Sequence, residues 1–154
     1  MSNTPLNLKR DSTTDPTIKM TLQIIKDAII LKADAILLEL DTELHLKVHE
    51  ELESLRQLLE NKSLTVDQFF FKIGRLPNAF GVTYTINGVQ HQCPSASGEL
   101  FGSVINILLI AVGIPYWTKD EISTPLETIN PASKWMLESK DLTQRIQLQR
   151  IRAT

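Results

Sequence analysis

The longest regular pattern of apolar residues runs from position 17 to position 60, and no glycine or proline interrupts it. Apolar residues three or four apart lie on one face of an α-helix. Two such rows are present: Ile18, Leu22, Ile25 and Ile29, continued by Ile36 and Leu40, and then Leu44, Val48, Leu52, Leu55 and Leu59. A single helix over 17–60 is long for a globular domain. We therefore expect either one extended amphipathic helix or a helical hairpin that breaks near Asp41–Thr42, where Asp41 is a suitable N-cap.

A short helix is predicted after the polar break at 61–63. Thr65 and Gln68 have the spacing of a capping box, and Gly74 is a typical residue at the end of a helix. Between them lie three adjacent phenylalanines at 69–71. Adjacent helical positions point in different directions, so at least one Phe must contact a neighbouring segment, a lipid boundary or a partner. Packing within the chain is the simplest of these arrangements.

A β-hairpin is predicted between positions 82 and 92. Alternating β-branched and aromatic residues precede Asn87–Gly88, and more residues suited to a strand follow this pair. Both turn positions of a two-residue hairpin need a positive φ, which Asn and Gly adopt readily. An isolated two-stranded hairpin is marginally stable in water, so this one must pack on a helix or pair with another strand.

The run from 100 to 117 contains no charged residue. At about 1.5 Å per residue, a helix of this length would be roughly as long as the hydrocarbon core of a bilayer is thick. Tyr116 and Trp117 stand at its end, where aromatic side chains favour the headgroup region. The run is therefore expected to be a membrane-spanning helix, with Tyr116 and Trp117 at the membrane interface. The alternative is a fully buried helix of a soluble domain, which has the same composition.

The C-terminal segment is predicted to be helical. Asn130–Pro131 has the sequence of a helix start, with Asn as the N-cap and Pro in the first turn, and the helix would run to about Arg152. The expected fold class is thus mainly α, with a long amphipathic helix or helical hairpin, a short β-hairpin, an apolar and transmembrane helix, and a polar C-terminal helix. The expected organisation is a flexible arm at 1–16, a helical domain at 17–117, and a loop with the last helix at 118–154.

The apolar run also resembles the last membrane helix of a loose group of uncharacterised bacterial membrane proteins. That helix ends in a small residue followed by Gly-x-Pro-aromatic-Trp. The residues of this chain that match are Gly102, Gly113, Pro115, Tyr116 and Trp117. The resemblance covers only 100–117, and the chain departs from the group immediately afterwards, at 118–121. It implies a membrane segment and assigns no catalytic residue.

Composition excludes several classes of function. The 154 residues are 42% hydrophobic and 22% charged, with a formal net charge of −2, which is ordinary for a globular chain. This near balance of charge gives no electrostatic argument for binding nucleic acid. The single cysteine, Cys93, excludes an internal disulfide and a structural zinc site built on thiolates. The N-terminus lacks the pattern of a secretory signal peptide, so its portion of the chain is expected in the cytoplasm.

The candidate residues for metal binding are Asp41, His45, His49 and Glu53, which are spaced four apart. On a helix they would form one stripe, and two imidazoles four residues apart can bind one divalent metal ion. However, the glutamate of the HExxH motif is replaced by Leu46, and no second helix carries a matching Glu-x-x-His. A solvated polar face explains the stripe more simply, so no cofactor is predicted.

A second candidate for chemistry is the pair His91 and Cys93. Two residues apart on a strand, they share a face, as a cysteine nucleophile and its base would. Nothing in the sequence supplies an orienting carboxylate or oxyanion donors, and phosphate-loop and Gly-x-Ser-x-Gly motifs are absent. We therefore predict no catalytic residue.

These observations favour a non-enzymatic, membrane-anchored helical module for protein interaction. In this hypothesis the helix over 17–60 presents its face to a protein partner or to a second copy of the chain, and residues 100–117 hold the module at the membrane. The alternatives are a small soluble helical binding protein of the cytoplasm, and a metal-binding protein that uses His45 and His49.

Overall fold

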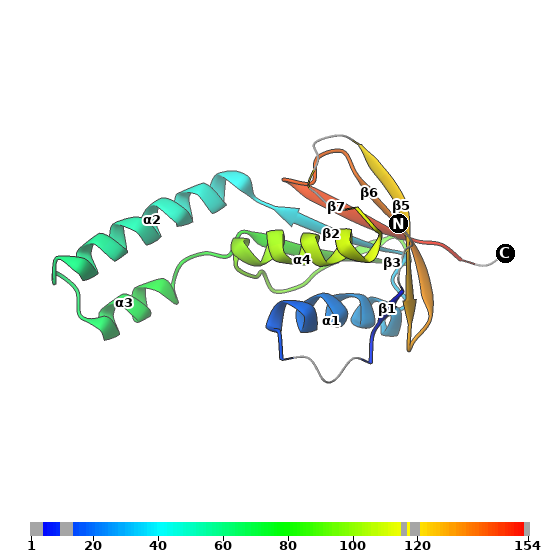
Figure 1. The fold of residues 1–154 in the computed structure, drawn as a ribbon, viewed down its shortest axis with the longest axis horizontal. Helices are drawn as coiled ribbons and strands as arrows, with labels where there is room; N and C mark the ends of the chain where they lie inside the picture. The colour runs from blue at the N-terminus through cyan, green and yellow to red at the C-terminus, as the bar shows by residue number, and fades with distance from the viewer. Residues whose placement is uncertain (1–4, 10–13, 115–116, 118–120, 153–154) are drawn as a thin grey trace.

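The computed structural model describes residues 5–9, 14–114, 117 and 121–152. These residues form four helices and a seven-stranded sheet (Figure 1). In chain order the elements are β1 (Leu6–Asn7), α1 (Pro16–Ile30), β2 (Ala35–Leu40), α2 (Thr42–Glu60), α3 (Val66–Ile73), β3 (Phe80–Ile86), β4 (Val89–Gln92), α4 (Gly98–Ala111), β5 (Ile122–Ile129), β6 (Ser133–Ser139) and β7 (Arg145–Arg150).

The strand order in the sheet is β1-β5-β6-β7-β2-β3-β4. The pair β1 and β5 is parallel, and the other neighbouring strands are antiparallel. Ile36 of β2 lies opposite Tyr84 of β3 and Leu148 of β7, so these three side chains share one face of the sheet. All three are buried. The register therefore collects alternate residues of every central strand into one apolar layer.

Helices α1 and α4 pack against each other and against this apolar face (Figure 1). Along β3, β6 and β7, buried residues alternate with half-buried or exposed ones, as expected for a sheet with one face packed on the core. The largest fully buried side chains come from both layers, and they include Ile25 of α1, Phe101 and Leu108 of α4, and Phe80 and Trp135 of the sheet. One core thus lies between the helix pair and the sheet.

The predicted fold class, mainly α, was wrong, and the protein has an α/β fold. The segment 17–60 contains two helices with the strand β2 between them. The turn from α1 into β2 passes through Lys32, which has a φ of 57°. Glycine usually occupies such a position, so the sequence carried no visible signal that the helix ends there.

The predicted C-terminal helix was also wrong. Asn130–Pro131 lies in the turn between β5 and β6, and the rest of the segment forms β6 and β7. Buried and exposed residues alternate along both strands, with Trp135 and Leu137 buried in β6 and Ile146 and Leu148 buried in β7. The apolar residues of this segment therefore follow the period of a strand.

The predicted membrane-spanning helix over 100–117 is contradicted, and with it the predicted membrane localisation. Helix α4 has 14 residues, and most of its apolar side chains are buried against the sheet and α1, whereas Ile110 is exposed. Within the described part of the chain, no helix has the length and apolar character needed to cross a membrane. Trp117 is half-buried and donates its indole N–H to the side chain of Asn106, whereas Tyr116 lies outside the described residues.

Two local predictions are confirmed. Strands β3 and β4 form the predicted hairpin, and its turn residues Asn87 and Gly88 have φ values of 51° and 78°. Helix α3 begins with the predicted capping box, in which Thr65 and Gln68 each accept the other's backbone N–H. Both features depend on contacts between residues close in sequence, which are the contacts that a sequence pattern reports best.

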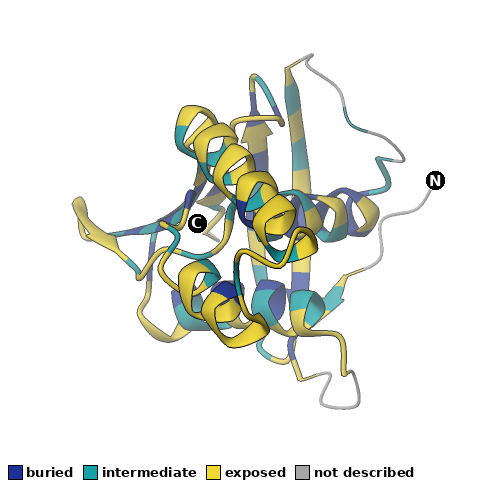
Figure 2. Ribbon diagram, turned by 90° about the vertical axis from the view of Figure 1, so that its left-hand side faces the viewer, coloured by how far each residue is buried: buried dark blue, intermediate teal, exposed yellow. Residues whose placement is uncertain are grey.

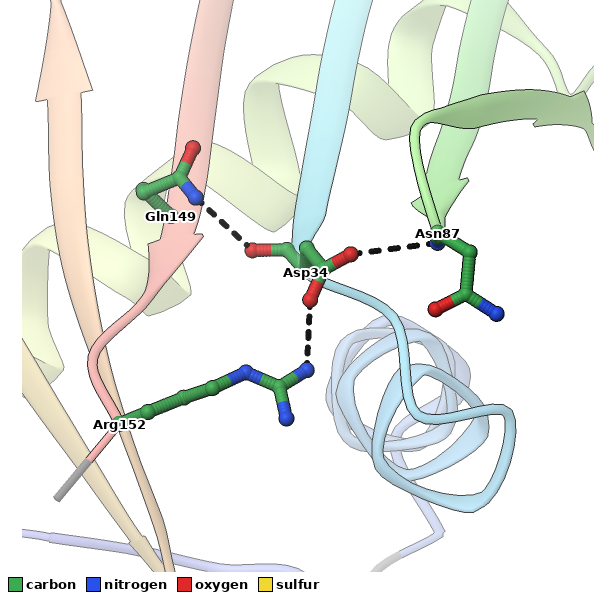
Figure 3. Close-up of polar contacts among 4 residues, drawn as sticks. All are labelled: Asp34, Asn87, Gln149 and Arg152. Atoms are coloured by element: carbon green, nitrogen blue, oxygen red, sulfur yellow. Dashed lines mark hydrogen bonds and ion pairs between the residues drawn. The ribbon is translucent and has the colours of Figure 1, made fainter. Parts of the chain in front are cut away.

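Asp34 joins three strands where β2 begins (Figure 3). Its carboxylate accepts the backbone N–H of Asn87 at 3.2 Å and pairs with the guanidinium of Arg152 at 2.6 Å. Its backbone carbonyl accepts hydrogen bonds from the side chain of Gln149 and from the backbone of Arg150. One residue thus fixes the β3–β4 turn and the end of β7 relative to β2.

Candidate functional site

Helices α2 and α3 form a helical hairpin, here called the arm, that projects from one end of the sheet (Figure 1). The two helices pack on each other, and neither packs extensively on a strand or on α1 or α4. Figure 2, which views the molecule from the end where the arm projects, shows both helices mostly exposed. Leu55 is the buried residue of α2, and Phe69 is the buried residue of α3. The arm therefore has a small core of its own and a large free surface.

Local sequence accounts for the shape of the arm. Asp41 caps α2 by accepting the backbone N–H of Leu44 at 3.0 Å. Lys62, in the turn between the helices, has a φ of 65°, and the capping box then starts α3. Exposed ion pairs such as Glu53–Arg56, at 3.5 Å, add only about 0.3–0.5 kcal/mol each. The hairpin is thus defined by its caps and by the contact between its helices.

The arm carries an aromatic patch, which we define as Val66, Phe70 and Phe71. The side chains of Phe70 and Phe71 are 64% and 63% exposed, and Val66 is 57% exposed. Phe70 meets the buried ring of Phe69 edge to face, with 5.7 Å between ring centroids, and the guanidinium of Arg75 lies 5.1 Å from the centre of the Phe71 ring. Exposed aromatic rings on a projecting element are typical of a surface that a protein partner covers.

A hollow of about 210 Å³ lies at the base of the arm, where α2 faces the N-terminus of α4. His45 and His49 line it from α2, and Ser97, Gly98 and Glu99 line it from the opposite side. A Cβ atom on Gly98 would overlap the imidazole of His45. Only glycine permits this close approach, which positions the base of the arm on the body of the protein.

The four residues predicted as a possible metal stripe have separate roles in the structure. Asp41 caps α2, Glu53 pairs with Arg56, and His45 and His49 line the hollow. Among the residues that the structure describes, no group of three or more His, Cys, Asp or Glu side chains is placed to hold a metal ion. The geometry therefore does not assemble the stripe into a binding site.

His91 of β4 and Cys93, which follows the strand directly, do lie on the same face, because His91 pairs with Tyr84 and the N–H of Cys93 bonds to the carbonyl of Val82. His91 is exposed and Cys93 is half-buried. Burial, followed by the negative charge of Asp27, raises the pKa of the Cys93 thiol. A nucleophilic cysteine needs the opposite shift, because the thiolate is the reactive form.

A third feature is an apolar hollow of about 650 Å³ between β1, α1 and α4. Its lining includes Leu6, Ile18, Leu22 and Ile110, and none of the described residues that line it carries a titratable side chain.

Sequence reasoning identified the three phenylalanines but did not determine which of them is exposed. It missed the contact between Gly98 and His45, because the two residues are far apart in the sequence and neither belongs to a recognisable motif. The chain matches no model of a known protein family, and no curated protein is significantly similar to it. The candidate site therefore rests on the geometry of the chain's own residues.

Proposed function

We propose that the protein is a non-enzymatic module for protein interaction and that its arm holds the partner. The observation that carries this proposal is the aromatic patch on α3, where the neighbouring residues Phe70 and Phe71 both have most of their surface in water. Burying one such side chain is worth about 1.5–3 kcal/mol. A partner that covers both rings would gain much of the energy that a binding hot spot supplies.

The arrangement of the arm supports the same proposal. Helices α2 and α3 contribute little to the core that α1 and α4 form with the sheet. The stability of that core therefore does not account for the presence of the arm. The helical face predicted to meet a partner was placed on 17–60. With β2 inside that segment, the part of it that belongs to the arm is α2, and α3, which packs on α2, lies outside the predicted segment.

Site-specific photo-crosslinking in the cells that produce the protein tests this proposal. A photoreactive phenylalanine analogue replaces Phe71, and in a matched control it replaces Glu138, which is exposed on β6. We expect a discrete protein adduct from position 71 that is absent from position 138. The adduct should be lost when Phe70→Ser is added, because this substitution removes the neighbouring anchor without touching the crosslinker.

Two outcomes would reject the proposal. One is that position 71 gives no adduct; the other is that positions 71 and 138 give the same set of adducts. Mass spectrometry of the adduct identifies the partner, and a mass that fits two copies of the chain would identify the partner as a second copy.

A further inference from the structure

Strand β4 ends the sheet with backbone groups that no described residue binds. In its pairing with β3, His91 lies opposite Tyr84 and Val89 lies opposite Ile86, and the N–H of Cys93 bonds to the carbonyl of Val82 at 2.9 Å. Successive residues of an antiparallel strand direct their backbone groups alternately to either side. The backbone groups of Val89 and His91 therefore face β3, and those of Gln90 and Gln92 point away from the sheet.

This edge lacks the usual protection against pairing with another strand. Between Arg75 and Glu99 the chain contains no Asp, Glu, Lys or Arg. All four residues of β4 are exposed, and none is proline. Natural edge strands are commonly protected by charged side chains, proline or bulges, and β4 has only its shortness and Pro94, which lies two residues beyond its end. The opposite edge, β1, is two residues long and directly follows Pro5.

Apolar side chains accompany the edge. Val89 of β4 is 57% exposed. Ile30 and Leu31, at the end of α1, are also exposed, and the turn that follows them leads to Asp34. Because Asp34 bonds to the backbone of Asn87, this turn lies next to the hairpin that carries β4 (Figure 3). Pairing along this edge would bury Val89, and the exposed apolar residues at the end of α1 lie near the turn of the same hairpin.

We propose that β4 pairs with β4 of a second copy of the chain, antiparallel and across a twofold axis, so that the two sheets become continuous. Only a pairing centred on His91 sets Gln90 opposite Gln92 of the second copy and Gln92 opposite its Gln90. Every outward N–H and C=O of these four residues then has a partner, whereas a shift to either side leaves some of them unpaired. Two copies of β4 can therefore satisfy each other's outward backbone groups, and because the strand carries no Asp, Glu, Lys or Arg, the copies would not repel each other. Both points favour a second copy of the chain as the partner strand.

Substitutions that remove the backbone donors test this pairing. In Gln90→Pro/Gln92→Pro both outward N–H groups are absent, while the N–H groups that face β3 remain. In the matched control, Gln90→Thr/Gln92→Thr, the side chains change and the N–H groups stay. In sedimentation velocity over a range of concentrations, we expect dimers for the unmodified chain and for the Thr variant, and monomers for the Pro variant. Circular dichroism checks that each variant is folded.

Disulfide trapping tests the register and does not depend on the proline variant. In a Cys93→Ser background, His91→Cys places two thiols opposite each other in a pair without backbone hydrogen bonds, where the Cα atoms are about 4.5 Å apart. In the matched control, Val89→Cys, the same symmetry places the two thiols far apart. Mild oxidation should give a covalent dimer for position 91 and not for position 89.

Three results would overturn the inference: a monomer at every concentration, a dimer that persists in the Pro variant, or crosslinking at position 89 as efficient as at position 91. Phe70→Ser/Phe71→Ser distinguishes this interface from the arm. If the dimer forms through β4, this variant should still dimerise. Loss of the dimer in this variant would place the contact on the arm. The inference does not rest on the proposed function and can fail independently of it.

Discussion

The hydroxyl group of Tyr84 donates a hydrogen bond to the backbone carbonyl of Ile24 at 2.7 Å. Tyr84 is buried on the helix-facing side of β3, and Ile24 belongs to α1. This bond therefore connects the two layers of the fold across the core. Burial of the phenol is the main cause that raises the pKa of Tyr84 well above its ordinary value, followed by its electrostatic interactions with Cys93 and Asp27.

The first prediction concerns the strength of this bond. Tyr84→Phe keeps the buried ring and removes the hydroxyl group. A neutral hydrogen bond of this kind contributes about 1 kcal/mol to stability, so the free energy of unfolding should fall by about that amount. Urea denaturation followed by circular dichroism measures the change. A variant as stable as the unmodified protein would show that the bond contributes nothing to the free energy of unfolding.

The second prediction is a loss of stability at alkaline pH. The ordinary pKa of a tyrosine side chain is 10.0, and burial in the folded protein raises the pKa of Tyr84 above it. The folded state therefore favours the protonated phenol, so its contribution to stability is complete below pH 10 and decreases as the pH rises further. Because other groups also titrate in this range, the measured quantity is the difference between the unmodified protein and Tyr84→Phe. This difference should shrink or reverse above pH 10, and a constant difference would contradict the prediction.

The third prediction concerns the base of the arm. Gly98→Ala places a methyl group where the His45 ring lies. Because the methyl group is fixed to the backbone of α4, the imidazole must rotate away, and we expect a cost of about 1 kcal/mol, at the lower end of what overpacking costs in a closed core. His45→Ala removes the ring, so the double variant should be more stable than Gly98→Ala alone. Thermal unfolding of all four proteins gives the coupling energy, and simple additivity would show that the two residues do not touch.

Sequence patterns identified the elements whose ends have local signals. Asp41 as a cap, Thr65 with Gln68, and Asn87–Gly88 are all visible without the fold, and all occur as expected. The end of α1 has no such signal. It depends on Lys32, a residue that rarely adopts a positive φ, so β2 was assigned to the helix before it. Alanine, leucine and isoleucine also fit a helix well, and only pairing with β3 and β7 makes 35–40 a strand.

The errors at 100–117 and 130–152 have different causes. Helix α4 is covered by the sheet and by α1, and a helix buried on most sides has the composition of a membrane helix. Composition could not distinguish the two environments. The strand period in 145–150, by contrast, is visible in the sequence, but Asn130–Pro131 has the sequence of a helix start and favours the wrong element. The direction of each phenylalanine in α3 required the position of α2, which no local pattern provides.

The last prediction separates the two roles of those phenylalanines. Phe69→Ala removes the buried ring of α3, a change that costs about 3–5 kcal/mol in a well-packed core. Phe70→Ala/Phe71→Ala removes rings that lie mainly in water, and each such change should alter stability by about 0.5 kcal/mol or less. Native-state hydrogen exchange is the suitable measurement, because an arm with a small core can open without unfolding the sheet.

In the Phe69→Ala variant, backbone amides of α2 and α3 should exchange much faster, while amides of β2 keep their protection. In Phe70→Ala/Phe71→Ala both sets should exchange as in the unmodified protein, because the hairpin keeps its internal contact. The comparison of these two variants also provides the control for partner binding. If the double variant loses the partner and keeps its protection pattern, the exposed rings act through the interface rather than through the fold. If its arm amides lose protection, the rings instead stabilise the arm and the aromatic patch is no longer evidence for a binding surface.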